Sequence, residues 1–125
     1  MSLSEQMQAD AKEGQRVARK HFVIGLDFTI SGLSELDEAA GNVDDFMRGG
    51  ASPENLEILS KTWGAYLGEV LCREAGAEWV EADNAHGVML KTAGGELVSP
   101  HECIRNRVAE GDSHSLPQFA ETARG

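Results

Sequence analysis

Apolar residues recur every three or four positions along residues 53–75, which is the spacing of one face of an α-helix. Ser52 supplies a usual N-cap for this helix, and Gly76 supplies a usual C-terminal end. At about 1.5 Å per residue the helix is about 34 Å long, enough to cross the whole domain. Gly64 and Gly68 lie four residues apart on one of its faces. Because glycine in a helix interior costs up to about 1 kcal/mol relative to alanine, we expect another element to pack closely there.

Four further segments have the spacing and the capping residues of helices. We expect Ser4 to cap the first of them and Ser31 the second, with a break in the second near Gly41. Residues 22–30, between these two helices, alternate with period two, which is typical of a strand, but their first residues also continue the helical pattern. We expect helix to about Ile24 and extended chain beyond it. The predicted helices cover residues 4–20, 31–47, 100–110 and 115–123.

Short strand patterns follow the central helix. They occupy residues 78–82, 87–92 and 96–98, and turn sequences separate them. Three successive short strands form most simply an antiparallel meander, which needs a helix against one face, and the central helix is the obvious candidate. The sequence therefore predicts a single α+β domain over residues 1–125, with N-terminal helices and a long central helix packed on a three-stranded antiparallel meander, followed by two short C-terminal helices. Residues 1–20 form the N-terminal helix, which is partly peripheral.

The charge balance narrows the classes of partner. The 125 residues include 11 Lys and Arg against 21 Asp and Glu, a net charge of −10 with neutral histidines. Nucleic-acid phosphates and anionic membranes bind surfaces with an excess of cations, so we expect neither as a partner. The first residues lack the basic and apolar pattern of a secretion signal, and no apolar run approaches the ~20 residues of a membrane span. We therefore expect a cytoplasmic protein.

Acidic residues concentrate in one interval without Lys or Arg, between residues 27 and 45. Its members are Asp27, Glu35, Asp37, Glu38, Asp44 and Asp45. Such a patch attracts a basic protein electrostatically. Because the chain also lacks recognisable catalytic motifs, our main hypothesis is a non-catalytic protein-binding or adaptor domain with a basic protein partner. A toxin-neutralising, immunity-like role is one version of this hypothesis, by analogy with other small acidic proteins.

The residues that most often carry chemistry have no catalytic or metal-binding spacing. None of the four histidines has the spacing of a zinc-ligand pair, so we predict no metal, no cofactor and no catalytic residue. We interpret Cys72 and Cys103 as reduced, packed thiols, with a disulfide between them as the alternative. Cys103 lies in the first turn of its predicted helix, where the helix dipole favours a thiolate, while the neighbouring Glu102 opposes it.

Glu69, on the central helix, allows two interpretations. It forms either a solvated surface pair with Arg73, four residues on, or a buried polar cluster with Tyr66 and Trp79. The buried cluster underlies our alternative hypothesis, a small-molecule-binding protein or small enzyme. The pocket would lie between the central helix and the meander, lined by Trp63, Tyr66, Glu69 and Trp79. A third alternative is a homo-oligomer that pairs through a strand edge or a face of the second helix.

A sequence motif in the central helix points to a family. Residues 64–69 read Gly-Ala-Tyr-Leu-Gly-Glu, and a Trp-bearing strand follows at Ala77-Glu78-Trp79. In this combination the chain resembles a bacterial family of uncharacterised proteins, a domain of unknown function. Weaker matches upstream and downstream, at 26–28, 36–37, Pro100 and Gly111, extend the resemblance over roughly residues 20–120. The resemblance implies a small cytoplasmic α+β protein with no assigned reaction, so no catalytic residue is carried over.

Overall fold

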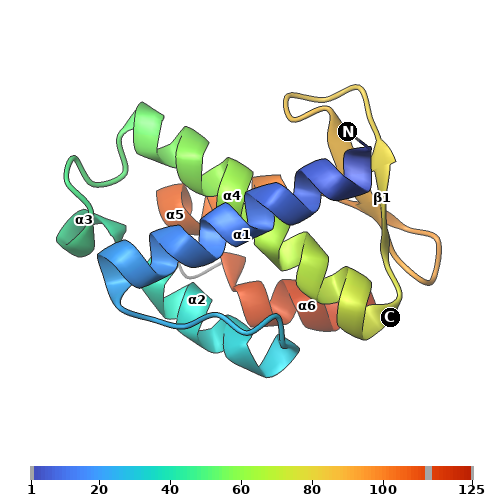
Figure 1. Ribbon diagram of the computed structural model, residues 1–125, viewed down its shortest axis with the longest axis horizontal. Helices are drawn as coiled ribbons and strands as arrows, with labels where there is room; N and C mark the ends of the chain where they lie inside the picture. Colours follow the sequence, from blue (N-terminus) through green and yellow to red (C-terminus); the bar gives the residue numbers. More distant parts are fainter. Residues whose placement is uncertain (1, 112–113, 125) are drawn as a thin grey trace.

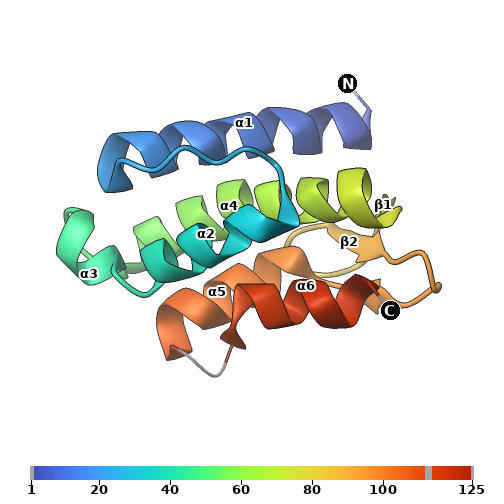
Figure 2. The ribbon, with the colours of Figure 1, turned by 90° about the horizontal axis from the view of Figure 1, so that it is seen from below.

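The helices of this protein form three stacked layers, and a small sheet closes one end of them (Figures 1 and 2). The computed structural model describes residues 2–111 and 114–124. The long helix α4 (Pro53–Ala75) lies between α1 (Leu3–Phe22) on one side and α5 (Pro100–Glu110) on the other (Figure 2). The prediction of an α+β fold built around a long central helix is confirmed.

Helix α1 begins and ends at other residues than the sequence pattern predicts. The Ser2 hydroxyl accepts a hydrogen bond from the backbone N–H of Glu5, and the Ser2 N–H donates to Glu5 Oε1, each at 3.1 Å. Ser2 is therefore the cap, and the predicted cap, Ser4, lies inside the helix. The helix ends at Phe22, between the end of the capped pattern at residue 20 and the expected limit at Ile24, because Val23 adopts a φ of 57°, in the left-handed region.

The second helical segment is broken where the glycine pattern predicts, but it starts differently. The cap is Thr29 and not Ser31, because the Thr29 hydroxyl accepts from the backbone N–H at the end of η1 (Ile30–Gly32). Helix α2 (Leu33–Ala40) follows directly, and after two residues comes the short α3 (Val43–Phe46). The predicted break in this segment is confirmed.

Helix α4 is the core of the molecule. Almost every residue between 59 and 71 is buried, and a helix buried on all sides belongs in the middle of a protein. Gly64 lets α5 approach, because a Cβ there would lie 2.7 Å from His101 Cα. Gly14 of α1 has the same role on the other side, where a Cβ would lie 2.7 Å from the carbonyl oxygen of Thr62. The close packing expected at the glycines of α4 is confirmed at Gly64, against α5, and at Gly68, against Trp79.

The predicted meander is also confirmed. Strands β1 (Glu78–Glu81), β2 (Val88–Lys91) and β3 (Leu97–Val98) form an antiparallel sheet in the order β1-β2-β3. Trp79 of β1 lies across Gly68 of α4, so closely that a Cβ on the glycine would overlap the indole ring. Nevertheless α4 packs more extensively on α1 and α5 than on the sheet, which covers only its C-terminal end (Figure 2).

Helix α6 (Leu116–Arg124) completes the fold by packing against α2, α4 and α5. Its buried residues, Leu116, Ala120 and Ala123, lie on one face. Within the described residues, none of the helices combines the length and the apolar character needed to cross a membrane.

Candidate functional site

Asp37, a member of the predicted acidic patch, connects three helices through its carboxylate. Its Oδ1 accepts a hydrogen bond of 2.8 Å from Nε of Arg107 and one of 2.9 Å from the backbone N–H of Leu116. The Arg107 side chain is buried, and Asp37 is half-buried. This carboxylate therefore ties α2 to both C-terminal helices, and its charge is used inside the molecule.

Two more carboxylates of the patch shape local turns. Asp27 Oδ1 accepts from the hydroxyl of Thr29 at 2.6 Å and from its backbone N–H at 3.2 Å, and the hydroxyl bond lowers the pKa of Asp27. Asp44 Oδ1 accepts from the backbone N–H of Ala51 at 3.0 Å. Both side chains lie on the surface, but their hydrogen bonds serve the loops on either side of α2 and α3.

Glu35 and Glu38 of the predicted patch border a groove that the sequence pattern did not reveal. Its volume is about 310 Å³, and it lies between the end of α1 and the helices α2 and α3. Apolar and aromatic side chains supply most of the lining: Phe22, Ile24, Ala39 and Phe46, with Asn42 beside them. Thus the structure brings two of the six predicted acidic residues to one apolar groove.

Large apolar side chains are exposed in the segments that form this groove. Phe46 is 56% exposed, although its ring leans on that of Phe22 with centroids 5.8 Å apart. Val23, at the end of α1, is 85% exposed. Asp45, another member of the predicted patch, is an exposed neighbour of Phe46 in the chain. Phe22 and Ile24 belong to the ambiguous segment of the sequence, whose period-two pattern marked the apolar side of this groove, while the acidic interval marked Glu35 and Glu38.

Trp63 and Tyr66, which were predicted to line a pocket, are fully buried in the core. The indole N–H of Trp63 donates to the carbonyl oxygen of Gly14 at 3.1 Å, which fixes α1 on α4. The hydroxyl of Tyr66 accepts from the backbone N–H of Phe28 at 2.9 Å. Burial raises the pKa of Tyr66 to about 12. These two side chains face α1 and the segment after it, away from the sheet.

Glu69 and Trp79, the other two predicted pocket residues, come together. The indole N–H of Trp79 donates to Glu69 Oε2 at 2.9 Å, and Glu69 is only 4% exposed. Glu69 Oε1 lies 3.7 Å from Nη2 of Arg73. Both interpretations of Glu69 are therefore partly right: it pairs with Arg73, but it is buried and bonded to Trp79, while Tyr66 bonds elsewhere.

A pocket of about 510 Å³ opens in front of this carboxylate. It lies where the start of α1, the end of α4 and β1 meet. The lining residues are Ser4, Gln8, Glu69, Cys72, Arg73, Ala77, Glu78 and Trp79. Burial, followed by the charge of Glu69, raises the pKa of Cys72 to about 12, so its thiol is neutral and forms part of the apolar wall.

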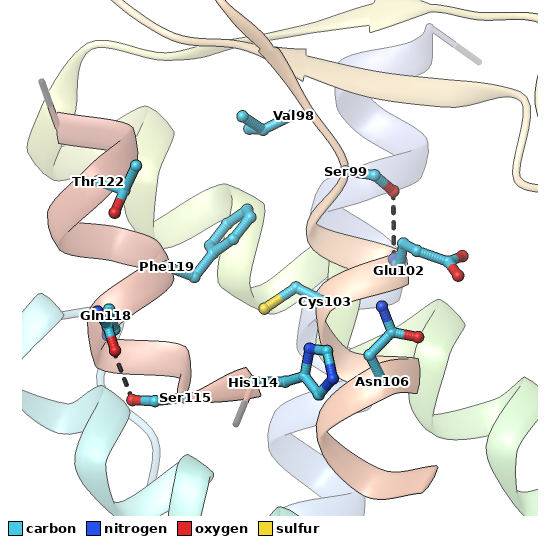
Figure 3. Close-up of a pocket in the computed structure, with 10 residues that line it drawn as sticks. All are labelled: Val98, Ser99, Glu102, Cys103, Asn106, His114, Ser115, Gln118, Phe119 and Thr122. Atoms are coloured by element: carbon cyan, nitrogen blue, oxygen red, sulfur yellow. Dashed lines mark hydrogen bonds between the residues drawn. The ribbon is translucent and has the colours of Figure 1, made fainter. Parts of the chain in front are cut away.

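A third cavity, of about 560 Å³, lies between α5 and α6 (Figure 3). The sulfur of Cys103 points toward Phe119, and His114 and Asn106 lie at one end. Burial, with a smaller contribution from Asp37, raises the pKa of Cys103 to about 12. Burial therefore outweighs the helix dipole, and this thiol lacks the thiolate character of a nucleophile. Both cysteines are free, which confirms the interpretation as packed thiols.

Two imidazoles stack where α4, α5 and the sheet meet, that of His101 buried and that of His86 half-buried. His101 is 2% exposed, and its ring stacks on that of His86 with centroids 4.9 Å apart. Among the described residues, His101 Nδ1 has no hydrogen-bond partner. Burial, followed by the proximity of His86, lowers the pKa of His101 to about 4. Nothing in the spacing of the histidines along the chain signals this stacked pair. Over residues 2–111 and 114–124 no three His, Cys, Asp or Glu side chains are grouped to hold a metal.

Comparison with known proteins adds no relative. No protein family, curated protein or solved structure matches this chain. The resemblance to a bacterial domain of unknown function stays a prediction that rests on the motif of the central helix.

Proposed function

We propose that this protein is a non-catalytic protein-binding domain, and that the groove between α1, α2 and α3 takes a basic, amphipathic segment of a partner protein. The observation that carries the proposal is a groove whose lining combines apolar and aromatic side chains with two carboxylates. Neutralising a basic enzyme is one role that such a surface would serve.

The apolar component supplies the driving force for binding. Phe46, which is more than half exposed, lines the groove together with Phe22 and Ile24, and the exposed Val23 lies between these last two residues in the chain. Contiguous apolar surface of this kind, rimmed by polar residues, is typical of interaction sites on soluble proteins. A partner that covers these side chains removes their apolar surface from water, which makes the free energy of binding more favourable.

The charged component selects the partner. Glu35 and Glu38 lie three residues apart on α2, so both project from one side of the helix over the groove. Asp45 adds a further exposed negative charge at the α3 end. Lys or Arg residues flanking apolar anchors complement this arrangement, whereas acidic partners are repelled. The carboxylates of Asp27, Asp37 and Asp44 are left out of the proposed surface because each serves an internal hydrogen bond.

Binding of a labelled amphipathic peptide tests this proposal. The probe is a short helix-forming peptide of Leu and Lys, and the matched control peptide has Glu in place of every Lys. We expect the Lys peptide to bind and the Glu peptide to fail, as measured by fluorescence anisotropy at low salt. The affinity should fall as the salt concentration rises, because exposed charges are screened.

Charge-removing variants locate the site. Exposed ion pairs contribute about 0.2–1 kcal/mol each, so the double variant Glu35→Gln/Glu38→Gln should weaken the Lys peptide by about two- to thirtyfold. The control double variant, Glu54→Gln/Glu57→Gln, removes the same charge from exposed positions with the same spacing on α4. Equal binding of both peptides, or equal affinities of the two double variants, would overturn the proposal.

A further inference from the structure

We propose that the pocket in front of Glu69 binds the ammonium and carboxylate groups of a free α-amino acid with an apolar side chain. This inference goes beyond the proposed function and concerns a different place in the fold. The pocket adjoins Ser4 and Gln8 at the start of α1, whereas the groove adjoins Phe22 at its end. At about 1.5 Å per residue these two regions are on the order of 25 Å apart.

The first half of the site is a buried carboxylate held in a fixed position. Glu69 is 4% exposed, and its Oε2 is anchored by the indole N–H of Trp79 at 2.9 Å. Trp79 can reach it because Gly68 has no side chain to keep the indole away from α4. A buried carboxylate is costly unless cations or hydrogen-bond donors satisfy it, so Oε1 favours a positively charged group arriving through the pocket.

The second half of the site is the guanidinium of Arg73, which packs on an aromatic ring. Arg73 lies one turn after Glu69 on α4, and its Cζ lies 3.7 Å from the centroid of the Phe28 ring. This cation–π contact holds the guanidinium beside the carboxylate and not directly on it. The distance of 3.7 Å between Arg73 Nη2 and Glu69 Oε1 is within ion-pair range but longer than a hydrogen bond.

An α-amino acid matches this pair of opposite charges. Its nitrogen and its carboxylate oxygens are separated by roughly 3 Å, as bond lengths of about 1.2–1.5 Å dictate, which is close to the 3.7 Å between the two protein groups. The ammonium group can therefore donate to Glu69 Oε1 while the carboxylate accepts from the guanidinium of Arg73. Amino acids with the amine farther from the carboxylate place their charges too far apart for both contacts.

The remaining walls favour an apolar ligand side chain. Cys72, Ala77 and the Trp79 ring line the same pocket, and the Cys72 thiol is neutral. A volume of about 510 Å³ accommodates a side chain the size of leucine together with its backbone groups. Ser4 and Gln8 of α1 add polar groups at the other side of the opening.

A ligand series on the unmodified protein tests the proposal without any variant. Isothermal titration calorimetry would compare L-leucine with L-leucine methyl ester, which lacks the carboxylate charge, and with N-acetyl-L-leucine, which lacks the ammonium charge. We expect L-leucine to bind and each blocked form to bind at least about tenfold more weakly, since a charged hydrogen bond is lost in each case. The absence of L-leucine binding at millimolar concentration, or equal binding of the blocked forms, would overturn the inference.

Two matched variants then assign the site. Glu69→Gln retains the size of the side chain and an oxygen for the Trp79 bond, but removes the charge, so we expect at least about tenfold weaker binding of L-leucine. Glu81→Gln removes an exposed charge from the same strand, outside the residues that line the pocket, and should change the affinity by less than about threefold. Equal effects of the two variants contradict the assignment. The Glu35→Gln/Glu38→Gln variant should bind L-leucine normally, so failure here and failure of the groove proposal are distinguishable.

Discussion

Replacing Gly64 by alanine is expected to destabilise the protein, against the usual preference of helices for alanine. The new Cβ would lie 2.7 Å from the Cα of His101 and equally close to Cγ and Cδ2 of its ring. Ordinary carbon contacts are about 3.5–4.0 Å long, so α5 and α4 would have to separate by about 0.8 Å or more. Part of the obstacle is backbone, which no change of rotamer relieves. The movement would also stretch the 3.1 Å hydrogen bond from the Ser60 hydroxyl to the His101 carbonyl oxygen.

The magnitude follows from two opposing effects. Overpacking a filled core costs about 1–3 kcal/mol, and a contact with backbone belongs at the upper end of that range. Exchanging glycine for alanine in a helix interior returns up to about 1 kcal/mol. The free energy of unfolding of Gly64→Ala should therefore be about 1–2 kcal/mol lower than that of the unmodified protein.

Urea unfolding followed by far-ultraviolet circular dichroism measures this difference. The matched control is Gly25→Ala, because a Cβ at Gly25 would meet nothing within 4 Å. We expect the control to have unchanged stability or to gain up to about 1 kcal/mol, since alanine restricts the unfolded chain. A midpoint for Gly64→Ala equal to or above that of Gly25→Ala would refute the close approach of α5 to α4 as described.

Two further predictions concern ionisable groups, the buried His101 and the half-buried Asp37. The pKa of His101 is lowered from 6.5 to about 4, so between these pH values the unfolded chain takes up a proton that the folded protein excludes. The stability that depends on neutral His101 is therefore fully present above about pH 6.5 and is lost as the pH falls toward 4. The loss amounts to at most roughly 3 kcal/mol. His101→Phe should therefore flatten the dependence of the free energy of unfolding on pH in this window, and an unchanged slope would contradict the assignment to His101. Asp37→Asn removes the charge that binds Arg107 and should lower the free energy of unfolding, measured by urea titration, by about 1.5–3 kcal/mol. The control Asp45→Asn changes an exposed position and should alter the free energy of unfolding by less than about 0.5 kcal/mol. Equal stabilities of these two variants would show that Asp37 is not the link between α2 and the C-terminal helices.

The candidate sites were predictable in part, and the reason differs from one residue to the next. The neighbours Glu69 and Arg73 lie four apart on one helix, so their pairing follows from helical geometry alone. The bond from Trp79 to Glu69 depends on how a strand ten residues later folds back over Gly68, and the sequence offered it only as one of two alternatives. Trp63 and Tyr66 share the helix with Glu69 but face other neighbours, because each step of three residues turns the direction by about 60° around the helix axis, so that Trp63 and Glu69 point about 120° apart.

The sequence by itself determined the type and approximate limits of the helices and strands, because periodicity, caps and glycine positions act over a few residues. It also determined that something packs closely on Gly64 and Gly68, because glycine in a helix interior is unfavourable without a reason. Only the tertiary structure decided which acidic residues are available to a partner. Asp37 is bonded to Arg107, 70 residues away, while Glu35, two residues earlier on the same helix, borders an apolar groove. The positions of charged residues can be read from the sequence alone. Whether a charged side chain pairs within the fold or stays available to a partner depends on contacts between segments that are distant in sequence.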